Sequence, residues 1–268
     1  MNLLEYAMLE SLKRGRDDYG VVAVKAEFEA EGTRPDEYHR LLEITQRAGL
    51  KVALKIGGCE AVSDLLASKI YGVDHIIAPM VETRYALSKF ILAKNKTHGP
   101  DKQRTQFLFN LETETSLGNL SEMADLAKGN VSGIVFGRVD FTLSCGMART
   151  AVNDRRITDC VLQVAEVCRE KDLDLVVGGS VTDEAITALR EIRTIRLDRF
   201  ETRKVIFDGS AIESSRIEDG IANAVEFELN WLRNKRDYYE RIVGEDQSRI
   251  EVMEARANRN APVLAQST

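Results

Sequence analysis

Short apolar stretches alternate with longer amphipathic ones along most of this chain. The apolar stretches have the length and turn-bounded ends of strands, and the amphipathic ones repeat apolar residues at helical spacing. Alternating strands and helices form parallel sheets, and eight such units fit a closed barrel of roughly 250 residues. We therefore expect a (β/α)8 TIM barrel over about residues 18–208, in a single domain that spans residues 1–268. The expected strands are 21–29, 51–57, 73–79, 106–112, 131–136 and 173–178, with shorter ones near 194–198 and 203–207.

The helices that should cover this barrel follow from the same periodicity. They are expected at residues 1–16, 35–48, 59–71, 82–94, from about 120, 154–171 and 183–190. The polar segment Asn95–Arg104 contains Gly99-Pro100 and indicates an exposed connection. The segment Gly137–Gly146 is bounded by glycines and indicates a loop that carries Asp140. No G-x-G-x-x-G follows the first strand, so the pattern does not favour a dinucleotide-binding fold.

A long helix is expected after the barrel, at about residues 211–243. Its apolar residues recur at helical spacing and form a stripe, namely Ile217, Ile221, Val225, Leu229, Leu232, Tyr239 and Ile242. A helix in the outer ring of a barrel needs only about a third of that length. The surplus apolar surface should therefore meet another subunit in a homo-oligomer, a trimer or a hexamer, with packing on its own barrel as the alternative. The tail, about residues 258–268, is expected to be disordered.

The amino-acid composition indicates which classes of binding partner and which cellular compartment to expect. Lysine and arginine total 37 against 43 aspartate and glutamate, a net charge of -6 that argues against nucleic-acid binding. No apolar run approaches the roughly 20 residues that span a membrane. The four cysteines lack metal-ligand spacing, and no secretory signal is visible. We therefore expect reduced thiols in a cytoplasmic protein.

Two expected strands carry charges on one side only. In the first strand Lys25, Glu27 and Glu29 alternate with apolar residues, and in the second strand Lys55 does the same. The apolar side of a strand in a parallel barrel packs on helices, so the charged side should point into the barrel mouth. Lys55, Glu27 and Glu29 are therefore candidate catalytic residues, with ion pairing inside the barrel as the structural alternative.

Two carboxylates end or closely follow consecutive strands. Glu112 ends the strand 106–112, and Asp140 follows the strand 131–136. The carboxyl ends of barrel strands converge on the mouth where active sites lie. Two carboxylates that leave positions for water and substrate oxygens suit Mg²⁺. The alternatives for each residue are a solvated acid at a strand end or a helix cap.

Three passages carry a resemblance to a known family. They are VDHIIAPMVET (73–83), FNLETETSLGNLSEMA (109–124) and GIVFGRVDFTLSCG (133–146). They resemble the citrate lyase β-subunit and 2-oxo-acid (4-hydroxy-2-oxoheptanedioate-type) aldolase family of phosphoenolpyruvate/pyruvate-binding barrels. The family pattern of Ile-Glu-Thr followed by Gly-x-x-Asp some 28 residues later reads here as Leu111-Glu112-Thr113 and Gly137-Arg138-Val139-Asp140.

The resemblance implies roles for these residues. Glu112 and Asp140 would be ligands of a divalent metal, Mg²⁺ first, with Mn²⁺ or Co²⁺ as other candidates. Gly137, Arg138, Val139 and Asp140 would hold the carboxylate of the substrate beside the metal. By the resemblance, the partner of the chain is a small-molecule carboxylate.

The chain also departs from the family pattern. Lys55 stands where the family has an arginine, which keeps the charge but loses the bidentate fork. Met80 replaces a lysine in front of Glu82, a residue expected to support the site or cap a helix. His39, His75 and His98 are expected on a helix, near a strand start and in a loop, so proton transfer should fall to a metal-ordered water. Arg199, Glu201 and Arg203 are expected on a solvated face.

These observations lead to one functional hypothesis and two alternatives. We expect a metal-dependent carbon–carbon lyase or aldolase that acts on a 2-oxo acid or related carboxylate through an enolate. The first alternative is another enzyme of the same superfamily, such as a condensing enzyme, an acyl-CoA lyase, a mutase or a hydrolase. The second is a catalytically silent barrel that binds a carboxylate, which the pair Glu112 and Asp140 argues against.

Overall fold

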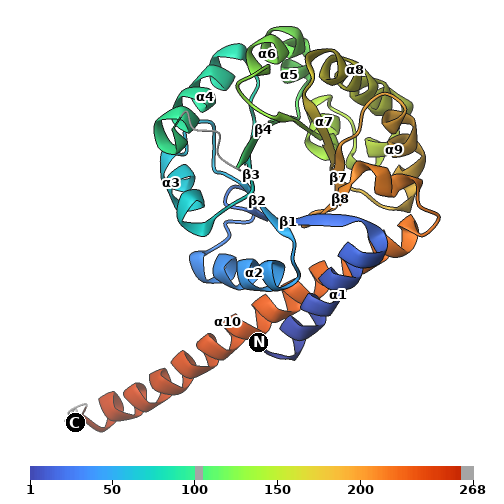
Figure 1. The fold of residues 1–268 in the computed structure, drawn as a ribbon. Coiled ribbons are helices and arrows are strands. Elements are labelled where there is room, and N and C mark those ends of the chain that lie inside the picture. The colour runs from blue at the N-terminus through green and yellow to red at the C-terminus, as the bar shows by residue number, and fades with distance from the viewer. Residues whose placement is uncertain (100–104, 261–268) are drawn as a thin grey trace.

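The computed structural model describes residues 1–99 and 105–260. Its strands form a closed barrel in chain order, surrounded by helices (Figure 1), as the sequence predicted. The strands are β1 (Val21–Glu27), β2 (Lys51–Lys55), β3 (His75–Ala78), β4 (Gln106–Leu111), β5 (Gly133–Gly137), β6 (Asp174–Gly178), β7 (Arg199–Glu201) and β8 (Val205–Asp208).

The helices begin and end close to the expected positions over most of the chain. They are α1 (Leu3–Tyr19), α2 (Pro35–Arg47), α3 (Val62–Tyr71), α4 (Arg84–His98), α5 (Glu114–Gly118), α6 (Leu120–Ala127), α7 (Arg138–Ser144), α8 (Arg155–Lys171), α9 (Ile186–Arg193) and α10 (Ile217–Asn260). Short 3-10 turns lie at Arg149–Asn153 (η1), Asp183–Ala185 (η2) and Gly209–Glu213 (η3).

The last strand breaks the parallel order. β1 to β7 pair in parallel, but β8 is antiparallel to both β7 and β1. Only residues 202–204 separate β7 from β8. A parallel crossover needs a dozen or more residues, so a link this short forces a hairpin. The strand expected near 194–198 is wrong, because α9 continues to Arg193 and the chain enters the sheet only at Arg199.

Two further expectations need correction. The segment expected as a loop at Gly137–Gly146 contains the short helix α7, because Arg138 begins a helix directly after β5. The expected connection Asn95–Arg104 is helical as far as His98, which is buried rather than in an exposed loop. The rest of that connection, residues 100–104, lies outside the described residues.

The interior of the barrel is apolar at its middle and charged at its mouth. The middle layer consists of Ala23, Ala53, Ile77, Leu108, Val135, Val176 and Ile206. The opposite faces of the strands, such as Val24 and Ala26 on β1, join the larger core beneath the helices. Lys25 and Glu27 therefore point into the barrel above the apolar layer, and this layer forms the floor of the mouth.

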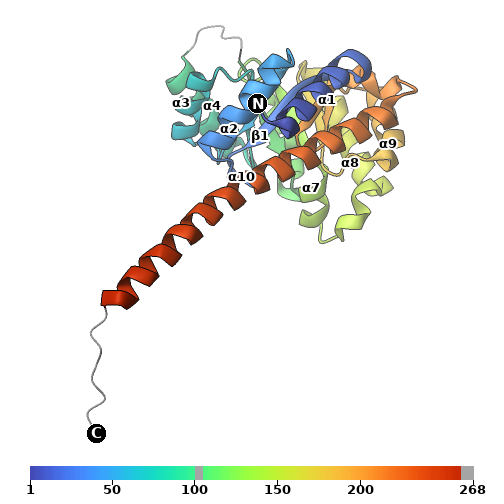
Figure 2. The same ribbon diagram turned by 90° about the horizontal axis from the view of Figure 1, so that it is seen from below.

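Helix α10 is longer than the periodicity indicated. Its first part packs antiparallel against α1, where Asn2 Nδ2 donates to Asn234 Oδ1 at 2.7 Å and Ser11 Oγ donates to the carbonyl of Asn223 at 3.2 Å. The remainder extends away from the barrel (Figure 2). It remains helical to Asn260, so residues 258–260 are not part of a disordered tail, and residues 261–268 lie outside the described part. Within the described residues, no helix has the length and apolar character needed to cross a membrane.

Candidate active site

Glu112 lies buried at the mouth, directly after β4. Its Oε1 accepts the backbone N–H of Met80 at 2.9 Å, and its Oε2 accepts the side-chain amide of Asn110 at 2.6 Å. The ammonium of Lys55 is 3.8 Å from Oε2. Burial raises the pKa of Glu112, and the negative charge of Asp140 acts in the same direction, against the opposing effect of Lys55. The carboxylate is thus rigidly held in a place where a further positive charge would stabilise it.

Glycine at position 137 makes room for this carboxylate. A Cβ at Gly137 would lie 2.8 Å from Oε2 of Glu112 and 3.0 Å from its Cβ, which is closer than side chains pack. Helix α7 begins at the next residue, and its first turn carries Asp140, which is exposed. Gly137 ends β5, the strand paired with β4. The structure therefore places Asp140 within one helical turn of the glycine that touches Glu112.

The ammonium group of Lys55 lies between the carboxylates of Glu29 and Glu112. Its Nζ lies 3.0 Å from Oε2 of Glu29 and 3.8 Å from Oε2 of Glu112. Burial works against the charged form, but the carboxylates of Glu112, Glu29 and Glu27 outweigh it and raise the pKa of Lys55. Lys55 is therefore an ammonium ion, suited to binding negative charge rather than to acting as an amine nucleophile.

A second ion pair at the mouth involves a residue that the sequence analysis did not select. The Nζ of Lys25 lies 2.5 Å from Oε1 of Glu201 on β7 and 3.2 Å from Oε1 of Glu27. Glu201 is buried, so its expected place on a solvated face is wrong. Gly178 accommodates it, because a Cβ there would lie 2.9 Å from Cγ of Glu201. Glu201 lies outside both short strands expected in this region, so no strand alternation in the sequence singled it out.

The other two residues of that sequence cluster lie apart from Glu201. Arg199 binds Asp174 at 2.8 Å at the opposite end of the barrel. Arg203 is exposed at the β7–β8 turn and binds Glu31 at 2.9 Å. The expectation of a solvated face therefore holds in part for Arg203 alone.

Negative charge is in excess among the groups that contact Lys25 and Lys55. Their ion pairs bring the four carboxylates of Glu27, Glu29, Glu112 and Glu201 against two ammonium groups, whereas Arg203 and Lys204 nearby are paired with Glu31. Burial would raise the pKa of Glu27, but Lys25, Lys55 and Arg203 lower it overall, so this residue stays ionised. A divalent cation beside Glu112 and Asp140 would offset this excess.

The carboxylates of Glu112 and Asp140 therefore fit a divalent cation, because they supply negative charge and oxygen ligands. Among the described residues, no group of three or more His, Cys, Asp or Glu side chains is placed to hold a metal. Mg²⁺ commonly uses one or two carboxylates and completes its octahedron with water and substrate oxygens. A pair of carboxylates with a raised pKa on one partner is compatible with that chemistry.

The histidines lie away from this centre, whereas Glu82 binds Thr113, the residue next to Glu112. His75 is buried at the start of β3, where burial lowers its pKa to about 3. The Nε2 of His98 lies 3.1 Å from Oγ of Ser68. Glu82 accepts the hydroxyl of Thr113 through Oε1 at 2.8 Å, which joins the turns after β3 and β4. Neither these histidines nor Glu82 contacts Glu112 in the described contacts.

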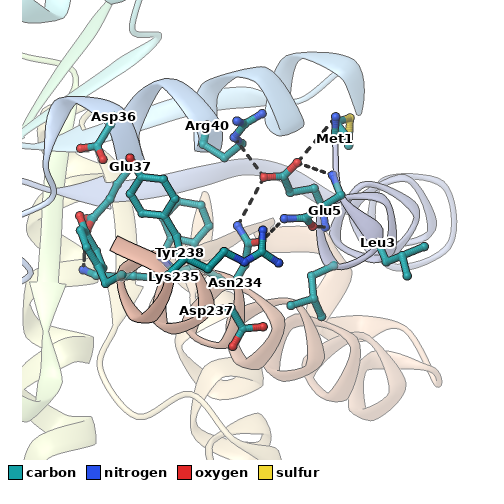
Figure 3. A pocket seen from close by; sticks show the side chains of 15 residues that line it. Met1, Leu3, Glu5, Asp36, Glu37, Arg40, Asn234, Lys235, Asp237 and Tyr238 are labelled. Carbon is teal, nitrogen blue, oxygen red and sulfur yellow. Dashed lines mark hydrogen bonds and ion pairs between the residues drawn. The ribbon is translucent and has the colours of Figure 1, made fainter. Parts of the chain in front are cut away.

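A pocket of about 650 Å³ lies outside the ring of strands, between α1, α2 and α10 (Figure 3). Glu5 points into it and binds Arg40 at 3.1 Å. Glu37 binds Lys235 at 3.0 Å on the other side. The charges of these two acids are already neutralised by protein groups, so the pocket has the character of a helix-packing site and not of the reaction centre.

The structure is a closed barrel of eight strands with charged residues at its mouth, and comparison with known proteins identifies its family. The family model for HpcH/HpaI aldolase/citrate lyase matches residues 46–206. The chain therefore belongs to this family and is a carbon–carbon lyase. A search of curated proteins found no significant match.

Two solved structures share the fold. The HpcH/HpaI aldolase from Desulfitobacterium hafniense DCB-2 is similar with a TM-score of 0.58 and 10% identity, over 74% of this chain and 82% of that one. An HpcH/HpaI aldolase/citrate lyase family protein from Burkholderia cenocepacia J2315 gives a TM-score of 0.57 and 12% identity, over 87% and 98%. At these identities, the two structures show the common fold alone.

Proposed function

We propose that this chain is a divalent-metal-dependent lyase that breaks or forms a carbon–carbon bond of a 2-oxo acid through an enolate. The observation that supports it most is the environment of Glu112. This buried carboxylate is held by Met80 and Asn110, faces Lys55, and has a raised pKa. A carboxylate that is fixed by hydrogen bonds, but whose negative charge its neighbours do not fully compensate, is suited to binding a cation.

Glu112 and Asp140 would hold the ion, with Mg²⁺ first and Mn²⁺ or Co²⁺ as alternatives. The ion would supply Lewis acidity, which polarises the carbonyl of the 2-oxo acid. The protein supplies the rest of the environment. Gly137 leaves the space in which Glu112 sits, and the backbone of the first turn of α7, from Arg138 through Val139 to Asp140, would orient the substrate carboxylate.

Lys55 would stabilise negative charge that develops on the substrate oxygen. Its ammonium is kept protonated by Glu29 and Glu112, so it can donate a charged hydrogen bond without first gaining a proton. An oriented donor of this kind acts on charge that appears in the transition state. The lysine also lacks the fork of the family's arginine, which would allow a looser grip on the substrate.

Proton transfer would be carried by an ordered water held by Glu27 or Glu29. Glu27 has a lowered pKa because of Lys25, Lys55 and Arg203, which outweigh its burial. It therefore remains an acceptor of hydrogen bonds at neutral pH, able to orient a water molecule but weak as a direct base.

The test is a turnover screen with a defined pair of variants. Oxaloacetate, 4-hydroxy-2-oxo acids, pyruvate with aldehydes, and acyl-CoA esters would be offered with Mg²⁺, Mn²⁺ or Co²⁺. We expect turnover of at least one 2-oxo acid that depends on the metal, and loss of that turnover in Glu112→Gln with circular dichroism unchanged. Metal-independent turnover, or full activity in Glu112→Gln, would contradict the proposal.

We also propose that the protein works as a homo-oligomer in the cytoplasm. Val225, Leu229 and Leu232 on α10 are 52%, 44% and 59% exposed, whereas Ile217 and Ile221 are buried. Only part of the apolar stripe thus packs on its own barrel, and the rest is available to a second copy, in a trimer or a hexamer. The unpaired cysteines suit a reducing compartment. Sedimentation of a monomer at micromolar concentration would contradict the oligomer.

A further inference from the structure

Arg138 is the first residue of α7 and one of the most deeply buried side chains at the mouth, with 2% of its surface exposed. Its guanidinium donates four hydrogen bonds. Nη2 donates to the carbonyls of Gly179 at 2.7 Å and Ser180 at 3.2 Å, and Nε to that of Gly178 at 3.4 Å. Nη1 donates to Oδ1 of Asn153 at 3.0 Å. All four acceptors are uncharged oxygen atoms, and burial lowers the pKa of Arg138 to about 10.

The three carbonyls belong to a turn with an unusual backbone. Gly179 has a φ of 88° and Ser180 a φ of 53°, both in the left-handed region. A residue other than glycine in that region is under strain and needs support from its surroundings. The bonds from Arg138 give this turn, residues 178–180, a fixed partner.

The same turn touches the first residues of α7 through its backbone. A Cβ at Gly179 would lie 2.8 Å from the amide nitrogen of Val139 and 3.1 Å from that of Arg138. Gly137, directly before α7, lies against Glu112, so closely that a Cβ at this position would clash with the carboxylate. The beginning of α7 is thus enclosed between Glu112 and the 178–180 turn.

We infer that Arg138 is a positioning residue that clamps the 178–180 turn onto α7 and thereby sets the place of Asp140 relative to Glu112. The inference rests on the proposed function, in which these two carboxylates share a metal. Arg138 would act through the backbone of its own helix, since its guanidinium is buried and donates four hydrogen bonds to protein oxygens. A lysine at this position could reach fewer of the four acceptors, because it lacks the planar fork.

Two measurements test the two parts of this inference. Hydrogen–deuterium exchange of peptides that cover residues 137–144 and 174–182 reports the clamp without any metal. Titration calorimetry with Mn²⁺ reports the affinity of the carboxylate pair without turnover. Groups that orient metal ligands typically contribute about 10- to 100-fold to affinity. We expect Arg138→Lys to speed exchange in both peptides and to weaken Mn²⁺ binding by about that factor.

The controls separate this effect from a general loss of a buried charge. Arg155→Lys makes the same substitution at an exposed arginine that binds Asp159 and Glu191, and it should leave both readouts unchanged. Asn153→Ala removes one of the four acceptors and should give a smaller change of the same kind, even if Arg138→Lys does not fold.

Each outcome decides a defined point. Exchange that is unchanged in both Arg138→Lys and Asn153→Ala overturns the clamp. Faster exchange with unchanged Mn²⁺ affinity overturns the positioning of Asp140. If the wild-type protein binds no Mn²⁺, the proposed metal chemistry is wrong, and the clamp is then judged by the exchange of the two peptides alone.

Discussion

Gly137→Ala perturbs the site through one methyl group. The new Cβ would lie 2.8 Å from Oε2 of Glu112 and 3.0 Å from its Cβ, whereas ordinary carbon contacts begin near 3.4 Å. The carboxylate would have to move by roughly half an ångström, since the glycine lies in a paired strand and cannot retreat. We expect the free energy of unfolding to fall by about 1–3 kcal/mol, which is typical of an overpacked site.

The effect on turnover should exceed the effect on stability. Moving Glu112 lengthens its bonds from Met80 at 2.9 Å and from Asn110 at 2.6 Å, and shifts the ligand pair. A displacement of about 1 Å in a reacting geometry can cost on the order of 10²-fold. We therefore expect turnover to fall roughly 10- to 100-fold, measured as kcat on a 2-oxo acid, with a cooperative urea transition retained.

Gly118→Ala provides the matched control for this substitution. Gly118 is helical, and a Cβ there would have no neighbour within 4 Å. Gly118 is the last residue of α5 and the added methyl group meets no atom, so this variant should keep the stability of the wild-type protein and be fully active. Equal behaviour of the two variants, or normal turnover in Gly137→Ala, would refute the reasoning.

Three further predictions concern the charges at the mouth. Lys55→Ala should lower kcat on the order of 10²-fold while Lys55→Arg keeps most of it, because a cationic donor to developing negative charge is needed; equal rates in both variants would exclude this role. Glu201→Gln should reduce the free energy of unfolding by about 1.5–3 kcal/mol in urea melts, since Lys25 loses one charged partner and keeps Glu27; an unchanged midpoint would show that the pair contributes nothing. Because the pKa of Glu112 is raised above its ordinary 4.5, protons should displace Mn²⁺ as the pH falls through that raised pKa; an inflection below 4.5 in the calorimetric affinity would contradict it.

Glu27 has a pKa shift of the opposite sign to that of Glu112, and this shift makes the stability of the fold depend on pH. Its pKa is lower in the folded protein than its ordinary 4.5. The stability that it contributes is fully present above 4.5 and is lost as the pH falls through the lowered value. In Glu27→Gln, the decline in urea midpoint below pH 4.5 should therefore be shallower than in the wild-type protein.

The barrel could be predicted from sequence because its strands carry their own pattern. In β1, charged and apolar residues alternate, and the structure turns Lys25 and Glu27 inward and Val24 and Ala26 towards the helices. β8 could not be predicted in its direction. Its reversal depends on the three-residue link after β7, and strands this short do not distinguish a hairpin from two parallel strands by their periodicity.

The candidate site was predictable where it depends on strand ends, and not where it depends on contacts across the barrel. Glu112 comes directly after β4 in the sequence, so its place at the carboxyl end of that strand could be predicted. Glu201 reaches Lys25 across 176 residues of chain, and no local pattern distinguishes such a glutamate from one on a solvated face. The role of Arg138 was hidden for the same reason, since its partners at 178–180 are backbone carbonyls that any sequence would provide.

The central claim is that Glu112 and Asp140 hold a metal that permits enolate formation. Exchange of the C3 protons of pyruvate in D2O, followed by proton NMR, tests it directly, because this exchange requires enolisation and no second substrate. We predict exchange in the wild-type protein with Mg²⁺, and none above the uncatalysed rate after chelation or in the folded Glu112→Gln and Asp140→Asn variants. Exchange that continues at the wild-type rate after exhaustive chelation, or in Asp140→Asn, would contradict the claim.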